Sequence, residues 1–266
     1  MIKRTFLLVI FVLPFCFLKA GIVILNGLSH IYNVENGKVY KGKIAIENTG
    51  NKTQSIKLFQ QDFSYTSDGT INYVSAYTNE RTNADWIKIN TNLVTLKAKQ
   101  KTEVFYEIII PRTISNPGSY WSVIMVEPVE EIKPSDSERG VNITSIVRYA
   151  IQIITDYKSE NAKPELKFES VKIEKQEGIR NINIAISNYG TLYCKPKASL
   201  EIYHYQTNEK IGTFTSLEMG LLPHTSKTFL IDISKLPPEK YNAVLIATDE
   251  NQNAFALNIE LEVKND

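Results

Sequence analysis

Short runs of alternating apolar and polar residues dominate the chain, and turn residues separate them. Such period-two runs predict half-buried β-strands, and no stretch shows the longer period of an amphipathic helix. In the first half, the expected strands cover residues 43–47, 55–59, 71–77, 85–89, 103–110, 120–127 and 142–157. In the second half, they cover residues 166–173, 179–187, 198–205, 227–233, 241–248 and 254–263. Many short strands at this spacing predict antiparallel sandwiches of the immunoglobulin type.

The polar segment 158–164, which ends in Pro164, lies between the two β-patterned halves and predicts a linker. The expected fold class is all-β, with two tandem immunoglobulin-like antiparallel β-sandwich domains at 21–157 and 165–266. Residues 184–190, IAISNYG, echo residues 44–50, IAIENTG, and both runs close on Asn-x-Gly. This echo supports two related sandwiches.

The stretch 116–129, NPGSYWSVIMVEPV, is apolar on both faces of the strand that it predicts. Trp121, Val123 and Met125 share one face, and the residues between them share the other. Apolar character on both sides predicts a strand that more than one surface covers. Trp121 and Trp86 are interpreted as core residues, with a carbohydrate-stacking role as the alternative.

The first twenty residues have the layout of a secretory signal peptide: Lys3 and Arg4, an apolar run, then Ala20. Cleavage there removes Lys19 as well, and turns the formal charge of +1 into about −2. No basic cluster typical of a nucleic-acid partner remains. After cleavage, no segment of membrane-spanning length is left, so we expect no membrane span and a periplasmic or secreted bacterial protein.

Residue types that would carry chemistry are sparse. His30, His204 and His224 lack metal-ligand spacing, and Cys194 is the only thiol left after cleavage, so no intrachain disulfide is expected. The chain has no nucleophile-elbow, P-loop or dinucleotide motif. The polar run 249–253 fits a turn better than a calcium loop. We therefore expect no enzyme, no cofactor and no metal.

Several phrases of the first half resemble the N-terminal domain of PapD-type periplasmic chaperones, which escort pilus subunits. The phrases are SHIY at 29–32, KIAIEN at 43–48, WIKI at 86–89, VTLKAKQ at 94–100 and SYWSVIMVEP at 119–128. The resemblance implies a PapD-like sandwich in which 146–157 takes the place of the strand that such chaperones lend to a subunit. The order of phrases also looks like the WxL-interacting surface proteins of other bacteria.

The resemblance further implies a cationic pair that holds the terminal carboxylate of the subunit. By our alignment its places fall at Ser29 and Gln152, and neither residue is cationic. A neutral pair loses the charge-assisted bonds that would anchor a carboxylate. Arg148, on the same face as Gln152, could substitute for the pair only in another register.

The strand expected at 142–157 has one strongly apolar face. At a sheet edge it could complete the sheet of a partner; the alternative is that it pairs internally and fills the core. The candidate partner-binding residues are Val147, Arg148, Tyr149, Ile151, Gln152 and Ile153.

These observations predict a non-enzymatic exported protein that binds another exported or surface protein subunit, as a chaperone-like factor in fibre or surface-protein assembly. The alternative is a cell-wall or glycan-binding surface module, similar to WxL-interacting proteins, that uses exposed aromatic residues such as Tyr73, Tyr77 and Tyr120. The oligomeric state is left open.

Overall fold

A computed structural model describes residues 21–129, 146–251 and 253–264. The predicted signal peptide and the loop predicted at 130–140 lie outside these ranges. The strands that precede residue 158 are β1 (Ile22–Ile24), β2 (Ser29–Val34), β3 (Val39–Asn48), β4 (Gln54–Tyr65), β5 (Ile71–Ser75), β6 (Ile87–Ile89), β7 (Leu93–Leu96), β8 (Lys101–Ile109), β9 (Gly118–Val129) and β10 (Tyr149–Tyr157). The strands that follow are β11 (Leu166–Gln176), β12 (Ile179–Asn188), β13 (Lys197–His204), β14 (Lys210–Thr215), β15 (Ser226–Asp232), β16 (Lys240–Thr248) and β17 (Ala254–Glu262). Two 3-10 turns, η1 (Ala84–Trp86) and η2 (Ser159–Asn161), complete the elements.

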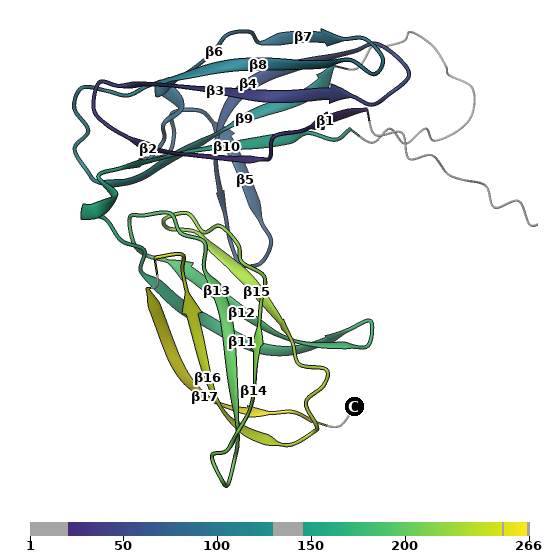
Figure 1. The fold of residues 1–266 in the computed structure, drawn as a ribbon, viewed down its shortest axis with the longest axis vertical. Helices are drawn as coiled ribbons and strands as arrows, with labels where there is room; N and C mark the ends of the chain where they lie inside the picture. The colour runs from purple at the N-terminus through teal and green to yellow at the C-terminus, as the bar shows by residue number, and fades with distance from the viewer. Residues whose placement is uncertain (1–20, 130–145, 252, 265–266) are drawn as a thin grey trace, which may run out of the picture.

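The chain is all-β and forms two immunoglobulin-like sandwiches in tandem, which confirms the predicted fold class. In the first sandwich, the β3 sheet (β1-β3-β8-β6) faces the β9 sheet (β2-β10-β9-β4-β5, with β7 also paired to β4). In the second sandwich, the β12 sheet (β11-β12-β15) faces the β16 sheet (β14-β13-β16-β17). Figure 1 shows the sandwiches at an angle, with the β4–β5 hairpin reaching toward the second. The domain limits 21–157 and 165–266 remain a prediction.

The alternating residues of the strands divide between two cores, as the period-two pattern predicts. Ile44, Val104 and Ile124 belong to the core of the first sandwich. Trp121 and Met125, on the other face of β9, belong to a cluster that continues into the second sandwich. The predicted faces of β9 are therefore confirmed, and both tryptophans are buried.

Both sandwiches contain the same Asn-x-Gly corner. The Asn48 Oδ1 accepts a bond from the Gly50 N–H at 3.0 Å, and the Asn188 Oδ1 accepts the same bond from Gly190 at 3.0 Å. Each Nδ2 group donates to the carbonyl four residues ahead, Lys52 O or Leu192 O, at 2.8 Å. The Asn-x-Gly echo in the sequence therefore corresponds to the same corner in both sandwiches.

A second shared device is a tyrosine near the start of β9 and of β16. The Tyr120 hydroxyl donates to Asn116 O at 2.9 Å, and the Tyr241 hydroxyl donates to Pro237 O at 2.8 Å. This is the tyrosine corner of immunoglobulin-like sandwiches. Both cases span four residues, so β9 and β16 are equivalent strands.

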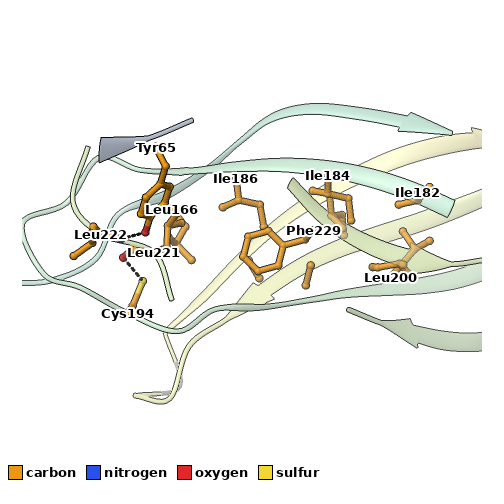
Figure 2. Close-up of a cluster of buried hydrophobic side chains, with 14 of the residues drawn as sticks. Tyr65, Leu166, Ile182, Ile184, Ile186, Cys194, Leu200, Leu221, Leu222 and Phe229 are labelled. Carbon is orange, nitrogen blue, oxygen red and sulfur yellow. Dashed lines mark hydrogen bonds between the residues drawn. The ribbon is translucent and has the colours of Figure 1, made fainter. Parts of the chain in front are cut away.

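Tyr65 at the end of β4 joins the two sandwiches. Its hydroxyl donates to Gly220 O at 3.2 Å and accepts from the Leu222 N–H at 2.9 Å. Figure 2 shows Tyr65 beside Leu166, Leu221 and Leu222, at the end of the second core. Because an aromatic side chain of the first sandwich fills part of the second core, the joint is a packed interface.

Candidate partner-binding edge

The first strand of the chain changes sheets between Leu25 and Leu28. The β1 strand pairs with β3, whereas β2 pairs in parallel with β10. Asn26 stabilises the crossing: its Nδ2 donates to Lys43 O at 2.7 Å, and its Oδ1 accepts from the Ala45 N–H at 2.9 Å. Gly27 has a φ of 83°, which a side chain would strain.

Because of this crossing, no described strand covers the beginning of β10 on the side opposite β9. The β9 strand pairs with all of β10, but β2 pairs only from Gln152 onward. The Gln152 N–H donates to Leu28 O at 2.8 Å. Since backbone groups of alternate residues point to the same side of a strand, those of Ala150 and Arg148 face this side as well. In the described ranges no strand pairs with them there, and we call residues 147–151 on this side the open edge.

The predicted strand at 142–157 is shorter in the structure, where β10 begins at Tyr149. Residues 142–145 lie outside the described ranges. Of the six candidate residues, Ile151 and Ile153 are fully buried in the first core. Tyr149 is half-buried, and its hydroxyl donates to Ile22 O at 2.8 Å. The side chains of Ile151 and Ile153 therefore fill the core, which is the alternative predicted for this strand, and the partner-binding role of the strand stays a prediction.

The other three candidates are accessible. Val147 is 58 % exposed, Arg148 is exposed, and Gln152 is half-buried. Gln152 lies opposite Ser29 in the parallel ladder, and the Ser29 hydroxyl donates to the Gln152 Oε1 at 3.3 Å. The two places that the resemblance assigns to a cationic pair are therefore neighbours, as aligned, and they hold two neutral side chains.

Arg148 does not replace the missing cations at this place. Its Nε lies 3.1 Å from the Glu127 Oε2, and the Lys57 Nζ lies 3.0 Å from the Glu127 Oε1. Glu127 on β9 lies opposite Lys57 on β4, and Arg148 comes one residue before β10 begins. Four strand residues span about 13 Å, so the Arg148 backbone lies well away from Gln152. In the described part of the chain, the side-chain hydrogen-bond partner of Gln152 is Ser29, which carries no charge for a terminal carboxylate.

Between these polar rows, the outer face of the β9 sheet is apolar. Ala150, Met125 and Phe59 lie side by side on β10, β9 and β4. The Lys57 Nζ lies 5.3 Å from the centre of the Phe59 ring. Leu25, Leu28 and Val147, near the open edge, are among the exposed large apolar residues. A strand added at this edge would therefore find backbone partners and apolar contacts together.

Sequence reasoning missed Asn26 and Gly27, the residues that create the open edge. The Asn-Gly dipeptide inside an apolar segment was the available signal, because it marks a turn. What the sequence could not show is that the strand resumes on the other sheet.

The aromatic surface of the alternative function is only partly present. Tyr73 and Tyr77 are 42 % and 62 % exposed. Tyr120 is only 9 % exposed, and its ring lies 4.9 Å from the ring of Trp86. The expectation that Tyr120 lies at the surface is therefore wrong: the tyrosine corner fixes it in the core. Tyr77 also lies outside its predicted strand, since β5 ends at Ser75.

The side chains that were candidates for metal binding or catalysis have structural roles. His30 Nδ1 lies 2.6 Å from the Tyr106 hydroxyl, and burial lowers the pKa of His30. Cys194 is buried, and burial raises the pKa of its thiol. Asp249 accepts bonds from the N–H groups of Asn251 and Asn253, which is the predicted polar turn. The described residues contain no group of three or more metal-binding side chains.

Within the described ranges, no helix has both the length and the apolar character to cross a membrane.

A known protein family matches part of the chain. The family described as "WxL Interacting Protein, host binding domain" matches residues 138–266, just under half of the chain. This range takes in β10 and the whole second sandwich. No curated protein matches the chain.

The similar solved structures include several chaperones. The YadV chaperone has 11% identity and a TM-score of 0.45, and the match covers 91% of this chain and 100% of that chain. The E. coli chaperone DraB has 11% identity and a TM-score of 0.41, and the match covers 92% of this chain and 97% of that chain. The CsuC-CsuE chaperone-tip adhesion subunit complex of Acinetobacter baumannii has 14% identity and a TM-score of 0.44. The match covers 90% of this chain and 98% of that chain. The matches confirm the loose resemblance to PapD-type chaperones. At these identities they concern the fold alone.

Proposed function

We propose that this chain is a non-enzymatic exported bacterial protein that binds another exported or surface protein by strand pairing at the open edge. The observation that carries the proposal is the uncovered side of β10, where Arg148 and Ala150 direct their backbone groups away from β9. An extended segment of a partner would continue the line of β2 beyond Leu28, on the side from which the chain arrives out of the β3 sheet. Main-chain bonds would then supply affinity, as in other β-augmentation complexes.

The surroundings define how the partner would be held. The neutral Ser29–Gln152 pair offers no charge-assisted bond to a terminal carboxylate, so an internal segment of the partner fits better than its C-terminus. Val147 and Leu28 offer exposed apolar contacts near the edge. The partner class that the family description names is a WxL protein, and a surface protein of that kind is the first partner to test. The predicted signal peptide supports export.

The test changes one backbone donor. Ala150→Pro removes the N–H that points to the open edge, and leaves the bonds between β10 and β9 in place. Ala150→Ser is the matched control, because it keeps the N–H and a small side chain. We expect Ala150→Pro to weaken binding of a WxL-domain surface protein by about fivefold in titration calorimetry, since one lost hydrogen bond costs about 1 kcal/mol.

Equal affinities of the two variants for that partner would contradict strand pairing at the open edge. Absence of any binding by the unmodified chain would contradict this partner class.

A second function is favoured by the family match itself. We infer that the second sandwich serves as a surface module that meets host material, because the matched range 138–266 is described as a host binding domain. Fluorescent full-length protein should bind cultured epithelial cells in a saturable manner by flow cytometry. Binding no greater than that of an unrelated immunoglobulin-like protein would contradict this function.

A further inference from the structure

The second sandwich carries a groove of about 560 Å³ on the outer face of its β16 sheet. Its lining residues come from β13, β16 and β17 and from the turn between β13 and β14; those that the argument uses are Tyr203, Asn208, Asn242, Val244, Asn258 and Glu260. Tyr203 lies opposite Asn242, and Asn242 lies opposite Glu260, so these three side chains form one row across the sheet. Val244 and Asn258 form the next row.

The polar groups of the groove are held in place by neighbours. The Asn242 Nδ2 donates to the Asn208 Oδ1 at 2.8 Å and to Tyr205 O at 3.3 Å. The Tyr203 hydroxyl donates to the Glu201 Oε2 at 2.7 Å. The Lys210 Nζ occupies the other oxygen of Glu201 at 2.7 Å. An amide and an aromatic ring with fixed positions lose less conformational entropy when a ligand binds.

The lining is neutral apart from Glu260, and it includes no lysine or arginine. Lys210, opposite Tyr203 in the sheet, is already paired with Glu201, so anionic ligands such as sulfated or phosphorylated chains would have to compete with that carboxylate for a positive charge. Three asparagine amides supply donors and acceptors together, which is what hydroxyl groups require. Tyr203 adds an aromatic ring, and Val244 an apolar floor.

We propose that this groove binds a neutral oligosaccharide, with Tyr203 packing against one sugar ring and Asn242 bonding to its hydroxyl groups. The proposal rests on the surface-module function above, and it gives that module a ligand class and a position. It also moves the glycan site from the tyrosines of the first sandwich to the second. An extended peptide added to the outer edge of β17 is a competing occupant.

The experiment titrates full-length protein with cellohexaose, chitohexaose and mannohexaose, and with a sulfated heparin hexasaccharide, by isothermal calorimetry. We expect saturable binding of at least one neutral hexasaccharide, and weaker binding of the heparin fragment. Tyr203→Ala and Asn242→Ala should each weaken that binding by about tenfold, the effect of about 1.4 kcal/mol. Tyr203→Phe keeps the ring and should change affinity less than about threefold. Tyr73→Ala, an exposed tyrosine on β5, is the control and should change nothing.

Three results would overturn the proposal: no neutral hexasaccharide binds below about 10 mM, a binding free energy near −2.7 kcal/mol; the heparin fragment binds best; or the two groove variants bind like the unmodified chain. Thermal unfolding of each variant separates loss of the site from loss of the fold. Cell binding by flow cytometry distinguishes failure of the glycan groove from failure of the surface-module function. Groove variants that still bind cells fully leave the surface function standing and remove the glycan groove from it.

Discussion

The two sandwiches share their corners and differ in how their last strand is covered. Strand β10 lies between β9 and β2, with only its first residues uncovered on one side. Its counterpart β17 pairs with β16 alone among the described strands. The difference comes from the first strand of each sandwich: β1 and β2 divide between two sheets, whereas β11 stays in the β12 sheet. The proposed partner binding at β10 therefore depends on where the crossing between the two sheets ends, not on the sequence of β10 itself.

The same comparison separates the two Asn-x-Gly corners. Asn48 and Asn188 are both buried. Asn188 also accepts a bond from the Glu165 N–H at 3.1 Å, at the end of the linker. Beside this corner, Thr191 O accepts from the Ser119 N–H of the first sandwich at 2.8 Å. One motif thus serves as an ordinary corner in the first sandwich and as part of the joint in the second.

The largest effect is expected from removing the Asn188 side chain, which forms the corner of the second sandwich. Asn188→Ala should lower the free energy of unfolding by about 3 kcal/mol, because it leaves buried N–H and C=O groups unpaired. It should also raise hydrogen exchange at Ser119, across the joint. Asn48→Ala should cost a similar amount in the first sandwich. It should leave unchanged the exchange of the Tyr193 amide, which donates to the Ser119 hydroxyl across the joint at 2.6 Å. Similar exchange of the Ser119 and Tyr193 amides in the two variants would contradict the claim that only the second corner belongs to the joint.

A pH-dependent effect should come from Asp156, at the joint. Burial, together with the charge of Glu250, raises the pKa of Asp156 to about 6, although the Ser119 hydroxyl donates to this carboxyl at 2.5 Å. Because the folded-state pKa lies above the ordinary value of 3.8, this carboxyl favours folding below pH 3.8, and the contribution is lost as pH rises through 6.

Asp156→Asn removes this titration. The unmodified chain should lose about 2 kcal/mol of stability relative to Asp156→Asn between pH 4 and pH 7.5, measured by urea unfolding at both values. A difference that does not change with pH would show that the joint leaves Asp156 solvated.

A smaller effect is expected when the joint loses one hydroxyl. Tyr65→Phe keeps the ring in the second core but leaves the Leu222 N–H without its acceptor. The cost should be about 1.5 kcal/mol, with a broader distribution of distances between spin labels on the two sandwiches. An unchanged distance distribution would show that packing alone holds the joint.

The smallest effect tests the equivalence of the sandwiches. Tyr120→Phe and Tyr241→Phe each remove one corner hydrogen bond, and each should cost about 1 kcal/mol. Chemical unfolding of each variant measures the two values. A difference above about 1 kcal/mol would show that the two corners are not equivalent in energy.

Much of this architecture could be predicted from the sequence, because strands leave a local signal. The alternation placed Trp121 and Met125 on one face of β9, and the Asn-x-Gly echo located both corners. The tyrosine corners were missed, although each tyrosine stands at the same distance after a turn segment that contains proline.

The open edge could not be predicted in the same way. Strand pairing is non-local, so nothing in the pattern of residues 142–157 showed that β2 covers β10 only from Gln152 onward. Burial of Ile151 and Ile153 follows from the same pairing. The joint at Tyr65 was hidden for a similar reason, since its partners Gly220 and Leu222 lie far along the chain.

Hydrogen exchange of single amides in β10, followed by NMR, tests the central claim most directly. In the free chain, the Ala150 amide should exchange much faster than that of Ile151, which pairs with β9. Added WxL-domain surface protein should slow Ala150 selectively. An Ala150 amide that is as protected as Ile151 in the free chain, or that stays unprotected in a complex with that protein, would contradict strand pairing at the open edge.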